Sequence, residues 1–333
     1  MIAADVLVIG AGISGLTIAS ALHKQGKTIL CVEKARGSGG RLSSKRQPVG
    51  DDYVQFDLGC TAFTARTPKF KQQVSAWCDA GAITTWVNHN DEHWYVGTPR
   101  SSSITRLLAN ELPVQFSTRV TRLERHHSQW AVYIEGHNSQ QCYALVDDVI
   151  ISAPAPQCYA LLPSDHALKS RLGYVTMGAQ WVIMLALKDA LNINDFCVSP
   201  NDVIASISYE NSKPNRQQGN DLHVYCLQAS VDWSNARMDY SKDKILMELT
   251  NAFAEFTQQA LYVEQDYCHR WLYAQGNENG YEAAGFLTST DGIHICGDYL
   301  VEDLGMHGVE AAYFSAMALT DYLSLPVLKQ KSV

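Results

Sequence analysis

Apolar and polar positions along the first thirty-odd residues follow the pattern of a strand, a helix and a second strand. Residues 6–9 and 28–32 form short, largely apolar runs, which are typical of strands buried on both faces of a parallel sheet. Residues 13–25 lie between them, and Gly26 is a typical helix terminator. The pattern predicts a βαβ unit at the start of the chain.

The same periodicities predict the remaining elements. Helical spacing indicates helices at residues 69–80, 101–110, 242–257 and 309–323. Alternating or continuous apolar runs indicate strands at residues 55–59, 120–124, 129–134, 143–146, 148–152, 181–187, 203–209, 222–229 and 292–298, and a hairpin at 86–96. Residues 42–48 are polar and are predicted to form a surface loop.

A glycine motif opens the predicted N-terminal helix. Gly10, Gly12 and Gly15 follow the first strand, and an acidic residue, Glu33, ends the second strand. In a dinucleotide-binding unit these glycines allow a tight turn, close approach of a pyrophosphate and close helix packing, and the carboxylate accepts hydrogen bonds from a ribose. Helix N-termini also attract phosphate through free N–H groups and the helix dipole. The context predicts a bound dinucleotide.

A second glycine pair, Gly39 and Gly40, precedes Arg41. This block distinguishes a flavin binder from a nicotinamide binder, so the sequence predicts noncovalently bound FAD and redox chemistry. Arg41 is interpreted as a phosphate partner, since guanidinium groups pair strongly with phosphates; a solvated loop arginine is the alternative.

The order of elements predicts an interleaved α/β architecture. A Rossmann-type FAD-binding domain takes residues 1–60, 98–157 and 288–333, and an α+β substrate domain takes residues 61–97 and 158–287. A ligand at the carboxyl ends of the parallel strands would meet all three pieces of the first domain.

Composition narrows the function classes. A formal net charge of -8 among 333 residues argues against a nucleic-acid binder. The 9 cysteines include no C-x-x-C pair, so neither a metal site nor a disulfide framework is expected, and a reducing compartment is favoured. No apolar run reaches membrane-spanning length and no leader segment is recognisable, so we expect a cytoplasmic protein without membrane partners.

Several blocks resemble the flavin amine oxidase superfamily and, within it, the renalase-type branch. The Gly39–Gly40–Arg41 block is typical of the superfamily. The blocks at residues 34–46 and 269–274 are typical of the renalase-type branch. Further matching blocks lie at residues 57–59, 63–66, 96–97, 99, 104–106, 153–157, 212–214 and 296–298.

The resemblance implies individual cofactor contacts. Arg41 would neutralise phosphate charge, Val120 would pack on the adenine, and Ala153 would lie beside the FAD. The start of the last helix at Val309 would face the flavin ring. The complete set of expected cofactor-binding residues is Gly10, Gly12, Ile13, Ser14, Gly15, Glu33, Lys34, Gly39, Gly40, Arg41, Leu42, Asp57, Gly59, Cys60, Val120, Ala153, Gly297, Asp298 and Val309.

The resemblance also implies an activity. Renalase-type proteins oxidise dihydro isomers of NAD(P) by hydride transfer to the flavin, and O2 reoxidises the flavin to give H2O2. The chain departs from the family after Gly59, where Cys60, Thr61 and Ala62 replace Ala-Gln-Tyr. Candidate pocket residues are Thr61, Ala62, Trp271, Tyr273 and His307; for Trp271 and Tyr273 a core position is an equal alternative.

Three function classes therefore stay open at the level of sequence. The first is an FAD oxidase acting on a reduced nicotinamide-like substrate or another planar amine. The second is an amine oxidase or desaturase with an unrelated small-molecule substrate. The third is an FAD-binding protein without turnover, which is suggested by the lost Gln-Tyr pair.

Overall fold

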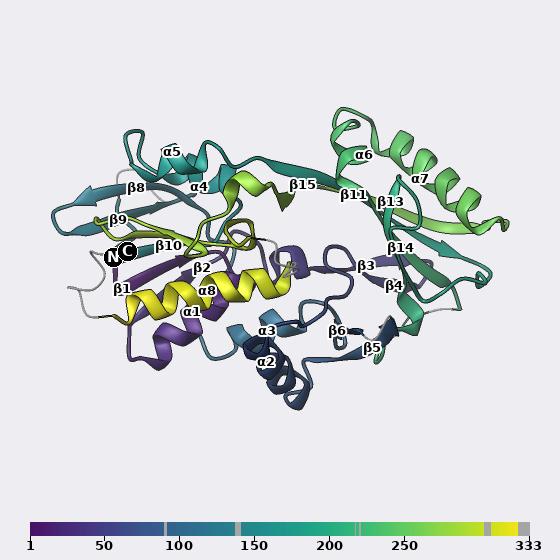
Figure 1. Cartoon of the computed structure of the whole chain (residues 1–333), viewed down its shortest axis with the longest axis horizontal. Coiled ribbons are helices and arrows are strands. Elements are labelled where there is room, and N and C mark those ends of the chain that lie inside the picture. The colour runs from purple at the N-terminus through teal and green to yellow at the C-terminus, as the bar shows by residue number, and fades with distance from the viewer. Residues whose placement is uncertain (90–91, 137–140, 217, 220, 303–307, 326–333) are drawn as a thin grey trace.

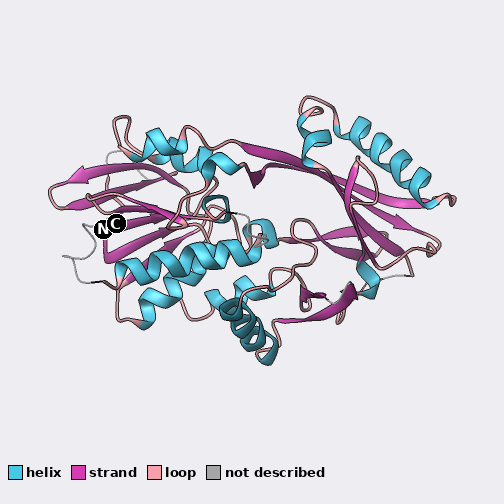
Figure 2. Ribbon diagram, viewed as in Figure 1, coloured by secondary structure: helices cyan, strands magenta, loops and turns pink. Residues whose placement is uncertain are grey.

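The protein is described here by a computed structural model that covers residues 1–89, 92–136, 141–216, 218–219, 221–302 and 308–325. One sheet lies at each end of an elongated molecule, and the two long strands β11 and β15 reach from the second sheet toward the first (Figure 1). Figure 2 shows helices packed against both sheets. The candidate cofactor site discussed below lies where the two halves meet.

The first sheet is of the Rossmann type. Its strand order is β16-β17-β10-β1-β2-β7, and β9 joins β10 while carrying β8 on its other edge. The four strands β2, β1, β10 and β17 run parallel. Bounds are Ile2–Ile9 for β1, Ile29–Val32 for β2, Val114–Gln115 for β7, Val120–His126 for β8, Gln129–Ile134 for β9, Ala144–Ile151 for β10, Phe286–Thr288 for β16 and Ile293–Cys296 for β17.

Alternate residues of β1 serve two separate cores, as the period of a strand requires. Val6 and Val8 pack with α1 (Ile13–Lys24) and α8 (Val309–Leu323). Leu7 and Ile9 pack on the other face with the β8–β9 hairpin, α4 (Ala155–Leu161) and α5 (Leu168–Leu172). Because both faces are covered, β1 is apolar throughout its second half.

The second sheet is antiparallel, with order β12-β13-β14-β11-β15. One face packs on α7 (Lys242–Thr257), through Ile245, Leu249 and Phe253. The other face packs on the hairpin β3–β4. Bounds are Met177–Leu187 for β11, Phe196–Val198 for β12, Ile204–Tyr209 for β13, His223–Ala229 for β14, Val263–Gly276 for β15, Ser44–Val49 for β3, Asp52–Asp57 for β4 and Val231–Asn235 for α6.

Smaller elements connect the two halves. These are α2 (Pro68–Asp79), the hairpin of β5 (Ile83–His89) and β6 (Glu92–Gly97), and α3 (Ser103–Ala109). Among the described residues there are also four short 3-10 helices: η1 (Gly40–Leu42), η2 (Glu210–Ser212), η3 (Glu278–Gly280) and η4 (Asp298–Leu300). In the part of the chain that is described, no helix combines the length and apolar character needed to cross a bilayer.

Most expected elements are confirmed, and two expectations are wrong. Residues 42–48 are not a surface loop, since Ser44–Val49 forms β3 and pairs with β4; its polar residues fit a strand because its alternate positions face solvent. Residues 143–146 and 148–152 are not two strands but one, β10, in which Asp147 and Asp148 continue the parallel ladder with β1.

The α/β fold class with its interleaved order is confirmed. The β3–β4 hairpin was assigned to the FAD-binding domain, but Val54, Phe56 and Leu58 share a core with β11 and β14 of the second sheet. The first fifty-odd residues therefore contribute to both halves.

Candidate cofactor and substrate site

The expected cofactor residues gather at the carboxyl ends of the parallel strands. Gly10 follows β1, Glu33 follows β2, Ala153 lies just beyond β10, and Gly297 follows β17. These four strands are neighbours in the sheet, so their ends share one edge. This edge is where dinucleotides bind in open α/β sheets.

Two glycines of the first motif are required by the turn itself. Gly10 adopts φ +110°, a conformation that residues with a side chain rarely take. A Cβ on Gly15 would lie 2.0 Å from the carbonyl oxygen of Gly10 and 2.4 Å from the hydroxyl of Ser152. Close packing of α1 against the end of β1 therefore depends on both residues, as the sequence predicted.

Gly12 serves a different purpose. A Cβ on Gly12 would meet no atom within 4 Å, and α1 begins there without a side-chain cap. The second glycine loop lies opposite, since a Cβ on Gly40 would be 3.7 Å from the Cα of Gly12, and the N–H of Gly39 donates to the carbonyl of Ala11 at 3.0 Å. An uncapped helix start beside bare glycine backbone fits a dinucleotide pyrophosphate.

Glu33 lies where a ribose-binding carboxylate is expected. Its two oxygens accept the N–H groups of Ala11 and Ala35, each at 2.8 Å. This ties the glycine turn to the end of β2. Lys34 donates to Gln157 at 2.9 Å, and Val120 is buried beside β2 in the first core.

Arg41 binds a carboxylate in this structure. Its guanidinium donates to both oxygens of Asp298, one at 2.7 Å, and to the carbonyl of Ala274 at 2.8 Å. Burial alone would lower the pKa of Arg41, but the charge of Asp298 raises it above its ordinary value. Two expected cofactor residues, Arg41 and Asp298, are thus brought together, and Ala274 brings β15 to the same place.

Asp57 has a structural role that the sequence did not predict. It belongs to a buried ion group formed by Asp57, Glu210, Lys213 and Arg216, whose side chains are all fully buried. Asp57 accepts from Lys213 at 2.9 Å and from both terminal nitrogens of Arg216 at 2.9 and 2.7 Å. Ser44 and the N–H of Ser101 also donate to it. The structure occupies this carboxylate with protein donors, and its expected part in cofactor binding stays a prediction.

The charges in the buried ion group sustain one another. Burial by itself would raise the pKa of Asp57, but Lys213 and Arg216 hold it well below its ordinary value. Burial would lower the pKa of Lys213, but Asp57 and Glu210 raise it. The contact between opposite charges therefore offsets the desolvation of Asp57 and Lys213 inside the protein.

Residues 57–60, called the junction segment below, connect the ion group with the cofactor loop at residues 39–42. The N–H of Cys60 donates to the carbonyl of Arg41 at 2.7 Å, and a Cβ on Gly59 would lie 2.0 Å from that same oxygen. Gly59 is therefore required for close backbone packing. Cys60 lies next to Ser101, whose hydroxyl donates to its carbonyl at 3.0 Å.

Trp271 and Gln228 also contact the junction segment. The indole N–H of Trp271 donates to the carbonyl of Leu58 at 3.0 Å, and the side-chain amide of Gln228 donates to the carbonyl of Gly59. Trp271 is thus placed on the face of β15 that meets the cofactor half. Gln228 was missed from the sequence, although it is a polar residue that follows Val224 and Cys226 at alternate inward positions.

The remaining expected residues lie around this junction. Thr61 is buried and directly follows the segment, with Ala62 partly buried beside it. Tyr273 is partly buried and precedes Ala274, the partner of Arg41. Ile13, Leu42 and Val309 share one hydrophobic cluster. His307 lies outside the described residues.

Ala153 and the start of α8 are fixed by buried groups. The hydroxyl of Tyr299 donates to the carbonyl of Ala153 at 3.1 Å, and Cys158 donates to the same oxygen at 3.0 Å. Ser14 donates to the carbonyl of Ala312, which joins α1 to α8. Glu310 accepts the N–H groups of Arg66 and Thr67, so its carboxylate holds the start of α2.

Comparisons with known proteins agree with this geometry. Residues 8–80 match the model of the NAD(P)-binding Rossmann-like domain. A crystal structure from Exiguobacterium sp. 255-15, assigned provisionally as a protoporphyrinogen oxidase, has a TM-score of 0.74 at 11% identity and covers 96% of this chain and 98% of that one.

Putrescine oxidase structures are also similar. A triple mutant has a TM-score of 0.69, and the wild type bound to putrescine has 0.66; each is 10% identical and covers 97% of this chain and 99% of its own. The chain has an amine-oxidase-like fold. At these identities the likeness establishes the architecture, a Rossmann-type domain with a sheet-rich second domain, and no particular reaction.

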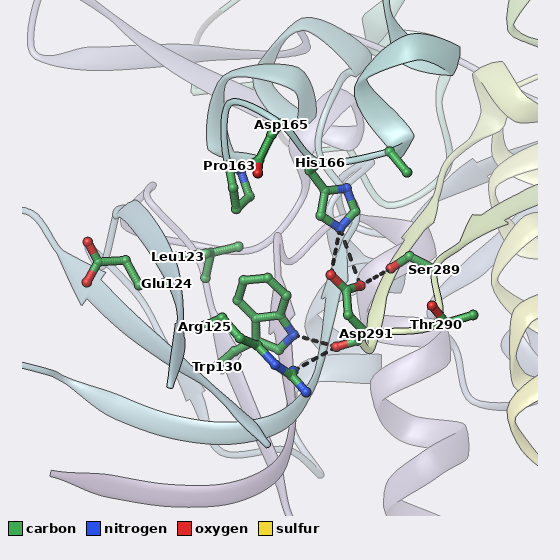
Figure 3. A pocket seen from close by; sticks show the side chains of 11 residues that line it. Leu123, Glu124, Arg125, Trp130, Pro163, Asp165, His166, Ser289, Thr290 and Asp291 are labelled. Carbon is green, nitrogen blue, oxygen red and sulfur yellow. Dashed lines mark hydrogen bonds and ion pairs between the residues drawn. The ribbon is translucent and has the colours of Figure 1, made fainter. Parts of the chain in front are cut away.

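A separate pocket of about 640 Å³ lies at the opposite edge of the first sheet, between the β8–β9 hairpin and the turn before β17 (Figure 3). His166 and Ser289 both contact the carboxylate of Asp291, at 3.3 Å for the ring nitrogen of His166. Burial would raise the pKa of Asp291, but Ser289 and His166 lower it. Serine and histidine each face the carboxylate, so this is not a nucleophile–base pair.

Proposed function

We propose that the protein is an FAD-dependent oxidoreductase that oxidises a small molecule and uses O2 as the electron acceptor. The observation that carries the proposal is the open, uncapped start of α1 at Gly12, opposite Gly40 and beside Glu33. A dinucleotide fits this arrangement, and the flavin-typical Gly39–Gly40–Arg41 block supports FAD over a nicotinamide dinucleotide.

The chain's own residues would hold the cofactor as follows. The first N–H groups of α1 and the bare backbone at Gly12 and Gly40 would bind the pyrophosphate, and Glu33 would bind the ribose. Arg41 would contribute positive charge at the phosphates while Asp298 keeps it oriented. When bound, FAD would supply the hydride acceptor and pass the electrons to O2, giving H2O2.

For the substrate, we propose a dihydro isomer of NAD(P), as the renalase-type resemblance implies. Trp271 and Tyr273 bring aromatic surface to the junction, which suits a planar ring. The carboxylates there, Asp57 and Asp298, are each paired with cations. A neutral ring therefore fits this part of the site better than a polyamine, whose ammonium groups bind best to uncompensated carboxylates.

The decisive test is anaerobic mixing of the purified protein with dihydro-NAD(P) isomers while flavin absorbance is followed. We expect a yellow protein that releases FAD on acid denaturation, and rapid loss of flavin absorbance with one isomer. A colourless protein that cannot be reconstituted with FAD would disprove the cofactor assignment. Reduction by simple amines instead would establish the amine oxidase alternative.

The departure at Thr61 and Ala62 gives a matched variant. Replacing both with Gln and Tyr restores the polar-aromatic pair typical of the family, and should raise turnover of the reactive isomer. If neither the wild type nor this variant is reduced by any isomer, the nicotinamide assignment is wrong. If amines also fail to reduce the flavin, the protein is an FAD-binding protein without turnover.

A further inference from the structure

Four consecutive carbonyls of the junction segment accept hydrogen bonds from side chains of other elements. Cys226 contacts the carbonyl of Asp57 at 3.3 Å, Trp271 that of Leu58, Gln228 that of Gly59, and Ser101 that of Cys60. Three of these donors belong to β14 and β15 of the second sheet. The segment beyond Asp57 is not part of a strand or helix.

The opposite edge of the same segment is held by the first half of the molecule. The N–H of Leu58 donates to the carbonyl of Ser43 at 2.9 Å, and that of Cys60 donates to the carbonyl of Arg41. Because Gly59 is in backbone contact with Arg41, a shift of the segment must displace the cofactor loop. The second sheet is therefore connected to the cofactor loop through these carbonyls.

We propose that Trp271 and Gln228 are positioning residues that set the place of the cofactor loop through their hydrogen bonds to Leu58 and Gly59. The inference rests on the proposed function, since it concerns how FAD is held. In this proposal the indole N–H of Trp271 is bound to the protein backbone. Only the face of the ring is then available to contact a ligand. Ser206 donates to the oxygen of Gln228 at 3.1 Å and so orients its amide toward Gly59.

The test uses Trp271→Phe and Gln228→Met, which keep apolar bulk but remove the donors. Trp181→Phe is the matched control, because the indole of Trp181 donates to the carbonyl of Arg237 at 3.2 Å and packs in the core on the other face of the sheet. All three variants lose one side-chain bond to a backbone carbonyl, and Gln228→Met also loses the bond from Ser206. Only the first two lose a bond to the junction segment.

One readout requires no cofactor. Cys60 is partly buried, and burial, reinforced by the charge of Asp57, raises the pKa of its thiol to about 12, so native-state alkylation is slow and should accelerate when the segment loosens. Peptide mapping by mass spectrometry separates Cys60 from the other free cysteines. We expect alkylation of Cys60 to accelerate about threefold to tenfold in Trp271→Phe and Gln228→Met, the range of one lost hydrogen bond, and to be unchanged in Trp181→Phe.

The second readout is FAD binding, measured on the holoprotein. FAD affinity should fall by a similar factor in the two test variants, and the visible circular dichroism of the flavin should change, while Trp181→Phe lowers only the melting temperature. The double variant should lose less than the product of the single factors, because both bonds hold one segment. Equal behaviour of all three single variants in both readouts would overturn the proposal. If the wild type binds no FAD, the proposed function fails, whereas Cys60 alkylation still decides whether the two side chains hold the segment.

Discussion

Two arginine–aspartate pairs lie near the junction, and they differ in exposure. In the pair of Arg41 with Asp298, the side chains are 35% and 13% exposed; in the pair of Arg216 with Asp57, both are fully buried. The first pair adjoins the uncapped glycine turn, whereas the second is enclosed with Lys213 and Glu210. The same chemistry therefore serves two purposes: the open pair can adjust to an anionic ligand, and the closed pair holds the end of β4 against the segment that follows β13.

Lys213→Met should have the largest effect. It leaves Asp57 and Glu210 with a single buried cation, and breaking a buried ion group in this way costs about 3–5 kcal/mol. The measurement is urea denaturation of the holoprotein. The matched variant, Lys213→Met with Glu210→Gln, restores charge balance and should recover part of the lost free energy of unfolding. A loss below about 1 kcal/mol in Lys213→Met alone would contradict the burial of the ion group.

Arg41→Ala should act mainly on the cofactor. A charge-assisted contact with phosphate is worth about 1.5–3 kcal/mol, so FAD affinity should fall roughly tenfold to a hundredfold. The free energy of unfolding of the FAD-free protein should change by only about 1 kcal/mol, because the pair is partly solvated. Titration with FAD is the measurement, and Arg41→Lys should be intermediate, since it keeps the charge without the paired donors. A wild-type dissociation constant would exclude the phosphate role.

Gly12→Ala and Gly15→Ala make the same chemical change on the two sides of the turn. The Cβ on Gly12 enters open space at φ -86°, which alanine tolerates, so the fold should be unaffected and FAD binding should weaken about tenfold or more. The Cβ on Gly15 meets the Gly10 carbonyl, so that variant should lose about 1–3 kcal/mol of stability even without FAD. Chemical denaturation and FAD titration of both variants separate the two effects. A stability loss in Gly12→Ala equal to that in Gly15→Ala would remove the evidence for an open cradle.

The sequence predicts the Rossmann half well because its signals are local. Apolar runs, glycine spacing and a carboxylate at a strand end lie within thirty-odd residues, and α7 and α8 begin and end as their periodicity indicates. The junction depends on long-range contacts. Asp57 meets Lys213 only after the chain has folded, so a carboxylate in a family motif gave no sign that protein cations would occupy it.

The same limit applies to the other features that the sequence did not predict. The polar residues of β3 pair with β4 over a core supplied by the second sheet, which no local pattern reports. Arg41 was recognised as a charge beside the cofactor loop, but its partner Asp298 comes from the far end of the chain. Gln228 could have been noticed as a polar residue at an inward strand position, although its partner, the carbonyl of Gly59, could not.

Replacement of His269 is expected to have the smallest effect, and it tests the electrostatic field around the buried ion group. It lies on β15, its ring is 4.7 Å from that of Trp271, and its pKa is lowered by burial and by the charges of Lys242 and Lys45. The folded state therefore binds fewer protons at this site than the unfolded state when the pH lies between the folded and unfolded pKa values. Stability then rises with pH in that window, so it should fall as the pH drops below about 6.5 and level off below the folded pKa.

His269→Gln removes the contribution of this histidine to the pH dependence of stability. One site contributes at most about 1.4 kcal/mol per pH unit, so the measurement is the difference between wild-type and variant unfolding free energies from pH 7.5 to 5, in which the other histidines cancel. We expect the wild type to lose stability relative to the variant as the pH falls. The opposite slope would mean that an acidic group governs His269, and the positive surroundings inferred for this face of β15 would be wrong.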